Sequence, residues 1–442
     1  MSLPTDVDRL IAALLPYIDA TASRISRKPA LEKGNSDVST FLEAIATLCA
    51  LHPQCNSVAV TSYTLATMQP VLCICPYPPR PESLPKDLKA WLGIFLEICR
   101  DSEASETARP SDVQTLRHSL QEMIYTQCKT KLRGVVLETW NWETFIGTIE
   151  SQRSTVASEL QDSLTKLIKS LRDLHPLVSN ECLSVEAIPT FFDCYRAVCE
   201  ALEPGVVRLI MDIDDFSTEK HHRFCSPWEA VKALLHPDKP MAWAKRCSLT
   251  WLVEMVDPSD MARNFRADFG SVCMGDSEAH QTAIDWKQIV QDLRSEIMQS
   301  SYLQKFGLRW DAEARVISTT DVVPPLPEVA LIEHLVRHQL ANHSSGRYIA
   351  TSELPSLPSV RLVEAINATL STRLILRTHN YMNIPTWCRL RRVGPWIIPG
   401  TTNKAVTNTL LERLWGDLME GLNAWEEERL YRYDDIESSQ IA

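Results

Sequence analysis

The chain has 442 residues, of which 45% are hydrophobic and 23% charged, and its formal net charge is −11. This is the composition of a globular protein, and the negative charge excludes a histone-like, general nucleic-acid binder. Glycine is scarce, at 13 residues in 442, or about 3% against a usual ~7%, which favours long helices over an all-β fold.

Several classes of protein are excluded by what the sequence lacks. It contains neither GxGxxG nor GxxxxGK[ST], the loops that hold dinucleotides and nucleotide phosphates. Asp6 and Asp8 precede the first apolar stretch, where a signal peptide would carry positive charge. No run of about 18 apolar residues predicts a membrane span. The thirteen cysteines are an odd number with scattered spacing, typical of free thiols in a reducing compartment. We therefore expect an intracellular protein, cytoplasmic or nuclear.

Helices are predicted over most of the first 300 residues, because apolar residues recur there every three to four positions. The predicted helices are 5–22, 37–51, 111–150, 154–174, 185–202, 227–236 and 283–300. The exception is 57–76, SVAVTSYTLATMQPVLCICP, where short apolar runs with partial alternation predict a pair of strands.

After residue 306 the predicted elements become shorter and mixed. Strands are expected at 308–310, 316–318, 347–350, 373–377 and 387–390, and helices at 328–341, 357–370 and 403–430. We expect an α+β, mostly α-helical fold in two parts. Residues 1–305 form a mainly helical region with a possible strand pair at 57–76, and residues 306–442 form a small α/β module with a C-terminal helix.

Three motifs in the C-terminal part suggest a family. Leu326-Pro327-Glu328 opens the first helix, and a strand at Tyr348-Ile349 leads to Ser356-Leu357-Pro358-Ser359 at the start of the second. Arg377-Thr378-His379 and Trp396-Ile397-Ile398-Pro399 follow. With the order helix, strand, helix, strand, these motifs resemble the core of the cytidine deaminase-like superfamily, in particular a fungal deaminase-like family, over roughly residues 320–430.

The resemblance implies a metal site that has been lost. Family members have His-x-Glu at the first helix and Cys-x-x-Cys at the second, and the histidine and two thiolates hold a Zn²⁺ that activates water while the glutamate moves protons. Here the ligand positions are Leu326, Ser356 and Ser359, and neither leucine nor a neutral hydroxyl is a zinc ligand. Glu328 keeps the proton-transfer position as a vestige.

The resemblance therefore implies a deaminase-like fold without deaminase chemistry, and no cofactor, although the family uses zinc. A surviving pocket around Glu328 and the two serines, with Arg377, His379 and Trp396 as possible ligand-binding residues, would accept a nucleotide or a nucleic-acid end.

Charge is unevenly distributed at the C-terminus. Residues 356–404 contain seven basic residues and one acid, whereas residues 405–442 contain nine acids and three arginines. A basic stretch that carries Trp387 and Trp396 has the residues to bind phosphates and stack bases. Alternatively, the acidic closing helix packs over the basic stretch and neutralises it.

Three other functions stay open at this point. One is an active zinc-dependent deaminase with non-standard ligands, and another is a helical scaffold that binds a protein partner. The third is a winged-helix module at 327–393, which requires a basic exposed face on the helix 357–370, where Arg361 is the only base.

Other groups of potential ligands are interpreted as structural. His334 and His338 are four residues apart, but His334 lies about 240° around the helix from Glu328 at ~100° per residue, so this pair is predicted to face solvent. The set His221, His222, Cys225, His236 and Cys247 matches no zinc-finger spacing.

Two further motifs are interpreted in the same way. Cys73-x-Cys75 is predicted to be a pair of buried strand thiols, and the acids at 212–215 are predicted to be solvated at a helix end.

Overall fold

The structure is a computed structural model, and it describes most of the chain. Apart from a few single positions and the gaps at 66, 68, 312 and 343–346, the described residues are 4–14, 36–52, 55–77, 88–94, 110–139, 142–153, 158–180, 183–202, 218–235, 251–269, 308–353, 355–378, 397–398 and 402–440. Almost all of the helix predicted for 283–300, the strand predicted for 387–390 and the acids at 212–215 lie outside these residues. Among the described helices, none has the length and apolar character needed to cross a membrane.

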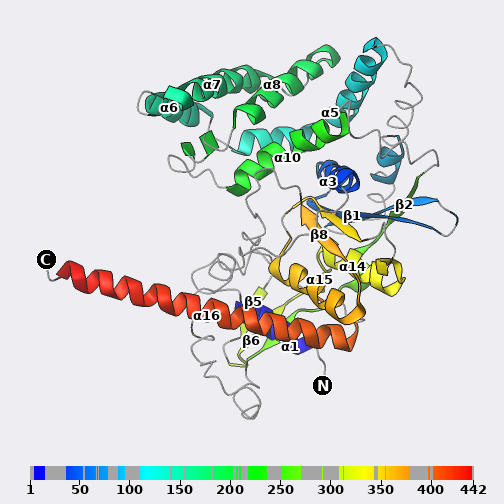
Figure 1. Ribbon diagram of the computed structural model, residues 1–442, viewed down its shortest axis with the longest axis vertical. Coiled ribbons are helices and arrows are strands. Elements are labelled where there is room, and N and C mark those ends of the chain that lie inside the picture. Colours follow the sequence, from blue (N-terminus) through cyan, green and yellow to red (C-terminus); the bar gives the residue numbers. More distant parts are fainter. Residues whose placement is uncertain are drawn as a thin grey trace.

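A five-stranded sheet lies at the centre of the fold (Figure 1). Its strand order is β3 (Leu252–Met255), β2 (Pro70–Tyr77), β1 (Ser57–Thr64), β7 (Tyr348–Thr351) and β8 (Ile375–Thr378). β1 pairs antiparallel with both β2 and β7, while β3 runs parallel to β2 and β8 parallel to β7. The strand pair predicted at 57–76 is confirmed, and it forms the middle of this sheet.

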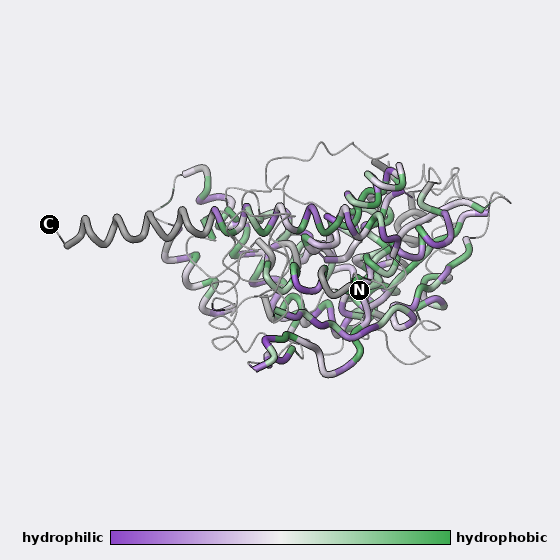
Figure 2. The backbone as a smooth tube through the Cα atoms, turned by 90° about the horizontal axis from the view of Figure 1, so that it is seen from below, coloured by the Kyte–Doolittle hydropathy of each residue, from purple (hydrophilic) through white to green (hydrophobic). Residues whose placement is uncertain are grey.

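Helices cover both faces of the sheet (Figure 1). One face carries α3 (Ser36–Ala50), behind which lie α5 (Pro110–Thr139), α6 (Trp142–Arg153), α7 (Ser158–Ser179), α8 (Ile188–Ala201) and α10 (Thr218–Leu235). The other face carries α14 (Pro327–Arg337) and α15 (Leu357–Leu370), with α1 (Pro4–Leu14) and α16 (Lys404–Gln440) beyond them. In Figure 2, hydrophobic and hydrophilic stretches alternate along the helices, as amphipathic packing requires. The predicted α+β, mostly helical class is confirmed.

The alternation of side chains along the strands divides the interior into two cores. Val58 and Val60 of β1 join a core with α3 and the helices behind it, which we call the α3-side core. Ala59 and Tyr63 join a second core with α14, α15, α1 and α16, the α14-side core. Because both faces of the sheet are covered, apolar residues occupy both the odd and the even positions of the strands. For this reason apolar and polar residues alternate only weakly in the sequence 57–76. The sheet takes strands from both sides of residue 305, and the division into domains at that residue stays a prediction.

A small antiparallel sheet supports the α14-side core. It has the order β4 (Arg266–Asp268), β6 (Val316–Thr319) and β5 (Leu308–Asp311), which confirms the strands predicted at 308–310 and 316–318. Arg263, just before β4, donates hydrogen bonds to both carboxylate oxygens of buried Asp8 at 2.7 Å. The backbone N–H of Arg266 in β4 donates to the same carboxylate at 3.2 Å and so links α1 to this sheet. Burial raises the pKa of Asp8, and the hydrogen bonds from Arg263 oppose that rise.

The closing helix α16 packs along α15 and neutralises its arginine. Arg361 donates two hydrogen bonds to the buried carboxylate of Asp417, at 2.8 and 2.5 Å, and another to Glu364 at 2.8 Å. Arg413 of α16 also donates to Glu364. The side chain of Arg361 is only 18% exposed. α15 therefore does not present the exposed basic face that a winged helix requires, and that prediction is wrong. For this residue, the acidic helix does cover the basic segment.

We expect Asp417→Ala to lower the free energy of unfolding by about 3 kcal/mol, because it removes one partner of a buried ion pair and leaves the Arg361 guanidinium with Glu364 alone. Chemical denaturation followed by circular dichroism at pH 7 measures the change. Glu412→Ala, at an exposed position of the same helix, is the control and should change stability by less than about 0.5 kcal/mol. Equal effects of the two substitutions would contradict a structural role for the pair.

Candidate functional site

The residues predicted from the motifs lie on the first turns of two neighbouring helices, α14 and α15. Pro327 occupies the first turn of α14, where its missing N–H costs nothing. Leu326 before it is extended, as a residue preceding proline prefers. Ser356 is the N-cap of α15, and its side chain accepts a hydrogen bond from the Ser359 backbone N–H at 3.3 Å.

The structure brings Glu328, Ser356 and Ser359 together in one hydrogen-bonded chain. The Ser359 hydroxyl donates to Glu328 Oε1 at 2.9 Å, and its oxygen lies 2.8 Å from Ser356 Oγ. The three residues are 6%, 2% and 0% exposed. Leu326 packs against the α14-side core. Ser356 and Ser359, two of the three predicted ligand positions, are thus joined through their hydroxyl groups to the Glu328 carboxylate.

A buried thiol adds to the surroundings of this carboxylate. Burial raises the pKa of Cys75 well above its ordinary value, and the nearby Cys73 and Glu328 raise it further. Cys75 is therefore a neutral thiol at physiological pH. Both Cys73 and Cys75 are buried and free, as predicted.

This arrangement limits the chemistry of the constellation. Hydroxyl oxygens and one carboxylate are a poor donor set for zinc, which favours thiolate and imidazole. The Ser359 hydroxyl touches a potential base, Glu328, but it has no exposed surface with which to attack a substrate. The geometry is that of a structural contact between two helix ends.

The other predicted ligand-binding residues are not placed at this constellation. The backbone of Arg377 lies in β8, paired with Ala350 of β7, and its side chain is outside the described part. His379 and Trp396 also lie outside the described residues.

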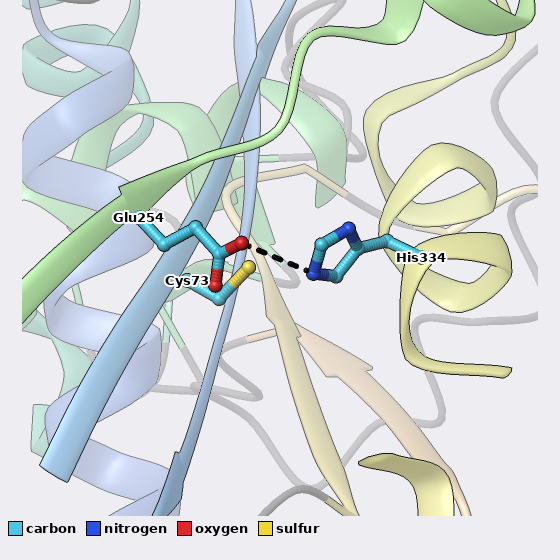
Figure 3. Close-up of side chains that lie close together, drawn as sticks. All are labelled: Cys73, Glu254 and His334. Carbon is cyan, nitrogen blue, oxygen red and sulfur yellow. Dashed lines mark ion pairs between the residues drawn. The ribbon is translucent and has the colours of Figure 1, made fainter. Parts of the chain in front are cut away.

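A second group of polar side chains meets on the same face of the sheet, and the sequence analysis missed it. Cys73 of β2, Glu254 of β3 and His334 of α14 point toward one another (Figure 3). His334 Nε2 lies 3.5 Å from Glu254 Oε1, and one ligand atom from each residue lies within 4.8 Å of the others. Tyr63 donates a hydrogen bond to the other oxygen of Glu254.

This group corrects the prediction that His334 faces solvent. Its side chain is 13% exposed, because α14 lies against β1 and β2. His338 is exposed, and its ring centroid is 4.5 Å from that of His334. Burial lowers the pKa of His334, whereas the neighbouring Glu254 carboxylate acts in the opposite direction. No short motif could have found this group, since its members are separated by 181 and 80 positions in the chain.

The cysteine and histidine set of α10 is placed only in part. His221 Nε2 and Cys225 Sγ are 3.5 Å apart, one turn along the helix, and both residues are buried. His236 and Cys247 lie outside the described residues. The described pair is part of the helical core.

Searches against protein-family models, curated proteins and solved structures find no match for this chain.

Removal of the Ser359 hydroxyl tests the hydrogen-bonded chain. Ser359→Ala should lower the free energy of unfolding by about 1–3 kcal/mol, because the buried Glu328 carboxylate loses the hydrogen bond from this hydroxyl. Adding Glu328→Leu should recover part of this loss, since no carboxylate then remains at position 328 to need the hydroxyl.

Denaturation curves measure both variants, and Ser259→Ala, at an exposed serine, is the control, with an expected change within about 0.5 kcal/mol. A Ser359→Ala variant as stable as this control would show that the contact contributes nothing.

Proposed function

We propose that the protein is a catalytically degenerate relative of the cytidine deaminase-like superfamily, whose fold serves a structural or binding role. The single observation that carries the proposal is the hydrogen bond from Ser359 to Glu328, with Ser356 beside it. In this proposal, the family's zinc-ligand positions are occupied by Leu326, Ser356 and Ser359, none of which can hold the ion that activates water.

The order of elements supports the resemblance. α14, β7, α15 and β8 follow one another in the predicted order, and β7 and β8 lie side by side and parallel. The first turns of the two helices meet, as two halves of a metal site must.

The chemistry explains why such a site would be inactive. Hydrolytic deamination requires a metal that lowers the pKa of a bound water, and a carboxylate that carries protons between this water and the base. Glu328 has the carboxylate, but its Oε1 accepts a hydrogen bond from Ser359 within the protein interior. Leu326, Ser356 and Ser359, the positions that would hold zinc in the family, offer neither an imidazole nor a thiolate to bind a metal and its water.

Two observations favour a structural or protein-binding role over binding of nucleic acid. Arg361, the one base of α15, is held by Asp417 and Glu364. The net charge of −11 opposes an approach to phosphates. In the second version of the proposal, the segment 356–404 binds a nucleotide or a nucleic acid.

An active deaminase with non-standard ligands is the alternative, and the group Cys73, Glu254 and His334 is the observation in its favour. However, His334 is six residues from Glu328 on α14, or about 9 Å along the axis at 1.5 Å per residue. A metal at that group would be beyond direct reach of the Glu328 carboxylate, so the alternative lacks its proton carrier.

Turnover measurements test the absence of catalysis. The full-length protein, supplied with zinc, should release no more ammonia from cytidine, deoxycytidine, adenosine or a cytosine-containing single-stranded oligonucleotide than the matched Glu328→Gln variant. Ammonia release by the parent that Glu328→Gln abolishes would establish the alternative, an active enzyme.

Restoring the family's ligands tests the resemblance itself. The triple variant Leu326→His, Ser356→Cys and Ser359→Cys should gain about one equivalent of zinc over its parent, because the resemblance places all three positions around one point. Both proteins should carry Cys73→Ser, so that the metal counted does not come from the Cys73 group. The double variant that keeps Leu326 is the control, with weaker binding expected. If the triple variant folds and gains no zinc, the positions do not form the family's metal site.

A further inference from the structure

We propose that Cys73, Glu254 and His334 form a binding site for a zinc-type transition-metal ion, separate from the degenerate positions Leu326, Ser356 and Ser359. The site would use one sulfur, one oxygen and one nitrogen from the protein and leave one coordination position open. This proposal does not depend on the proposed function, because it rests on side chains that the motifs do not include.

The backbone brings the three possible metal ligands close together. Cys73 and Glu254 are register partners on the parallel strands β2 and β3, so their side chains leave the same face of the sheet side by side. Cys73 belongs to the α14-side core. α14 packs on this face and brings His334 over the pair (Figure 3).

The distances are close to those of a metal site. With bonds of 2.0–2.3 Å and tetrahedral angles, zinc ligands lie about 3.3–3.8 Å from one another. His334 Nε2 and Glu254 Oε1 are already 3.5 Å apart, and all three ligand atoms lie within 4.8 Å. Side-chain rotations that move the ligand atoms by about 1 Å would bring all three into this range.

The histidine nitrogen that faces the group lacks a hydrogen bond within the described residues. His334 Nε2 is buried and makes no hydrogen bond within the described part of the protein, and such a buried polar atom is costly. The 3.5 Å ion-pair contact with Glu254 is a partial substitute. A bond to a metal would use the nitrogen lone pair and bring in the carboxylate as well.

The second oxygen of Glu254 is held in a way typical of metal ligands. It accepts a hydrogen bond from the Tyr63 hydroxyl of β1, and such outer contacts orient ligating carboxylates. Tyr63 is buried, so the carboxylate is positioned from within the core. The mixed sulfur, nitrogen and oxygen set suits zinc and cobalt rather than calcium or magnesium, which take oxygen ligands.

An ion would have a route to the site. The Glu254 side chain is 38% exposed, and β3 is an edge strand of the sheet. The Cys73 thiol is buried and the His334 side chain is 13% exposed, so both are less accessible than the carboxylate. An ion bound there would join β2, β3 and α14, which come from three distant parts of the chain.

Metal titration of the full-length protein, stripped with a chelator, tests the proposal. One equivalent of Co²⁺ should bind and give the absorption of a thiolate-bound, tetrahedral cobalt ion, and Zn²⁺ should displace it. Zinc should also raise the melting temperature, because it binds the folded state.

Matched variants assign the signal to the three residues. Cys73→Ser, His334→Gln and Glu254→Gln should each weaken binding at least tenfold, and Cys73→Ser should also remove the thiolate absorption. The controls are His338→Gln, at the C-cap of α14, and Cys75→Ser, the next thiol on the same face of β2. Both should bind the metal as the parent does. Circular dichroism of each metal-free variant checks that it is folded. Because Glu254 is partly exposed, Glu254→Gln still tests the site if the substitutions at the more buried Cys73 and His334 prevent folding.

Two results would overturn the proposal. One is a protein that binds less than a tenth of an equivalent of either metal at micromolar concentrations. The other is binding of one equivalent that is unchanged in folded Glu254→Gln and His334→Gln, which would place the metal elsewhere. In either case the group is an ion pair between α14 and the sheet edge.

Discussion

The central sheet is buried on both faces, and most other features of the molecule follow from this constraint. β1 lies in the middle, bonded to β2 on one side and β7 on the other, and its alternate side chains enter two different cores. Helices on each face must therefore bring an apolar surface. The polar groups that do enter, such as Glu328, Glu254 and Asp417, need partners, and each has a hydrogen-bond partner within the described structure.

The two polar groups on the α14 face of the sheet show how differently buried charge is accommodated. At the starts of α14 and α15, the buried Glu328 carboxylate accepts a hydrogen bond from a neutral group, the Ser359 hydroxyl. Near the sheet edge, Glu254 meets an imidazole and a thiol and stays partly exposed. One helix, α14, contributes to both groups from opposite ends. In our proposals, the first group stands where a metal site has lost its ligands, and the second group binds a metal ion.

The sequence predicted local elements better than it predicted their neighbours. The helix at 357–370 has the predicted bounds, because its capping serine and first-turn proline are local signals. β3 was not predicted because its four residues lie in a part of the sequence whose apolar spacing favours helices. They become extended by pairing with β2. Glu328 and His334 join different groups, in keeping with their separation around α14, but the side of α14 that carries His334 does not face water. That side is covered by strands from distant parts of the chain, which no periodicity within the helix reveals.

The long separation between the strands of the sheet also affects how the protein is made. The Thr61 side chain of β1 bonds to the Tyr348 carbonyl of β7 across 287 positions, so a ribosome must add nearly two-thirds of the chain before the hairpin of β1 and β2 gains its neighbour. Until then, one edge of an apolar hairpin is open to other nascent chains. Contacts of such high sequence separation also fold slowly. Timely shielding by a chaperone, or early packing of α3 on the hairpin, would then determine how much protein reaches the native state.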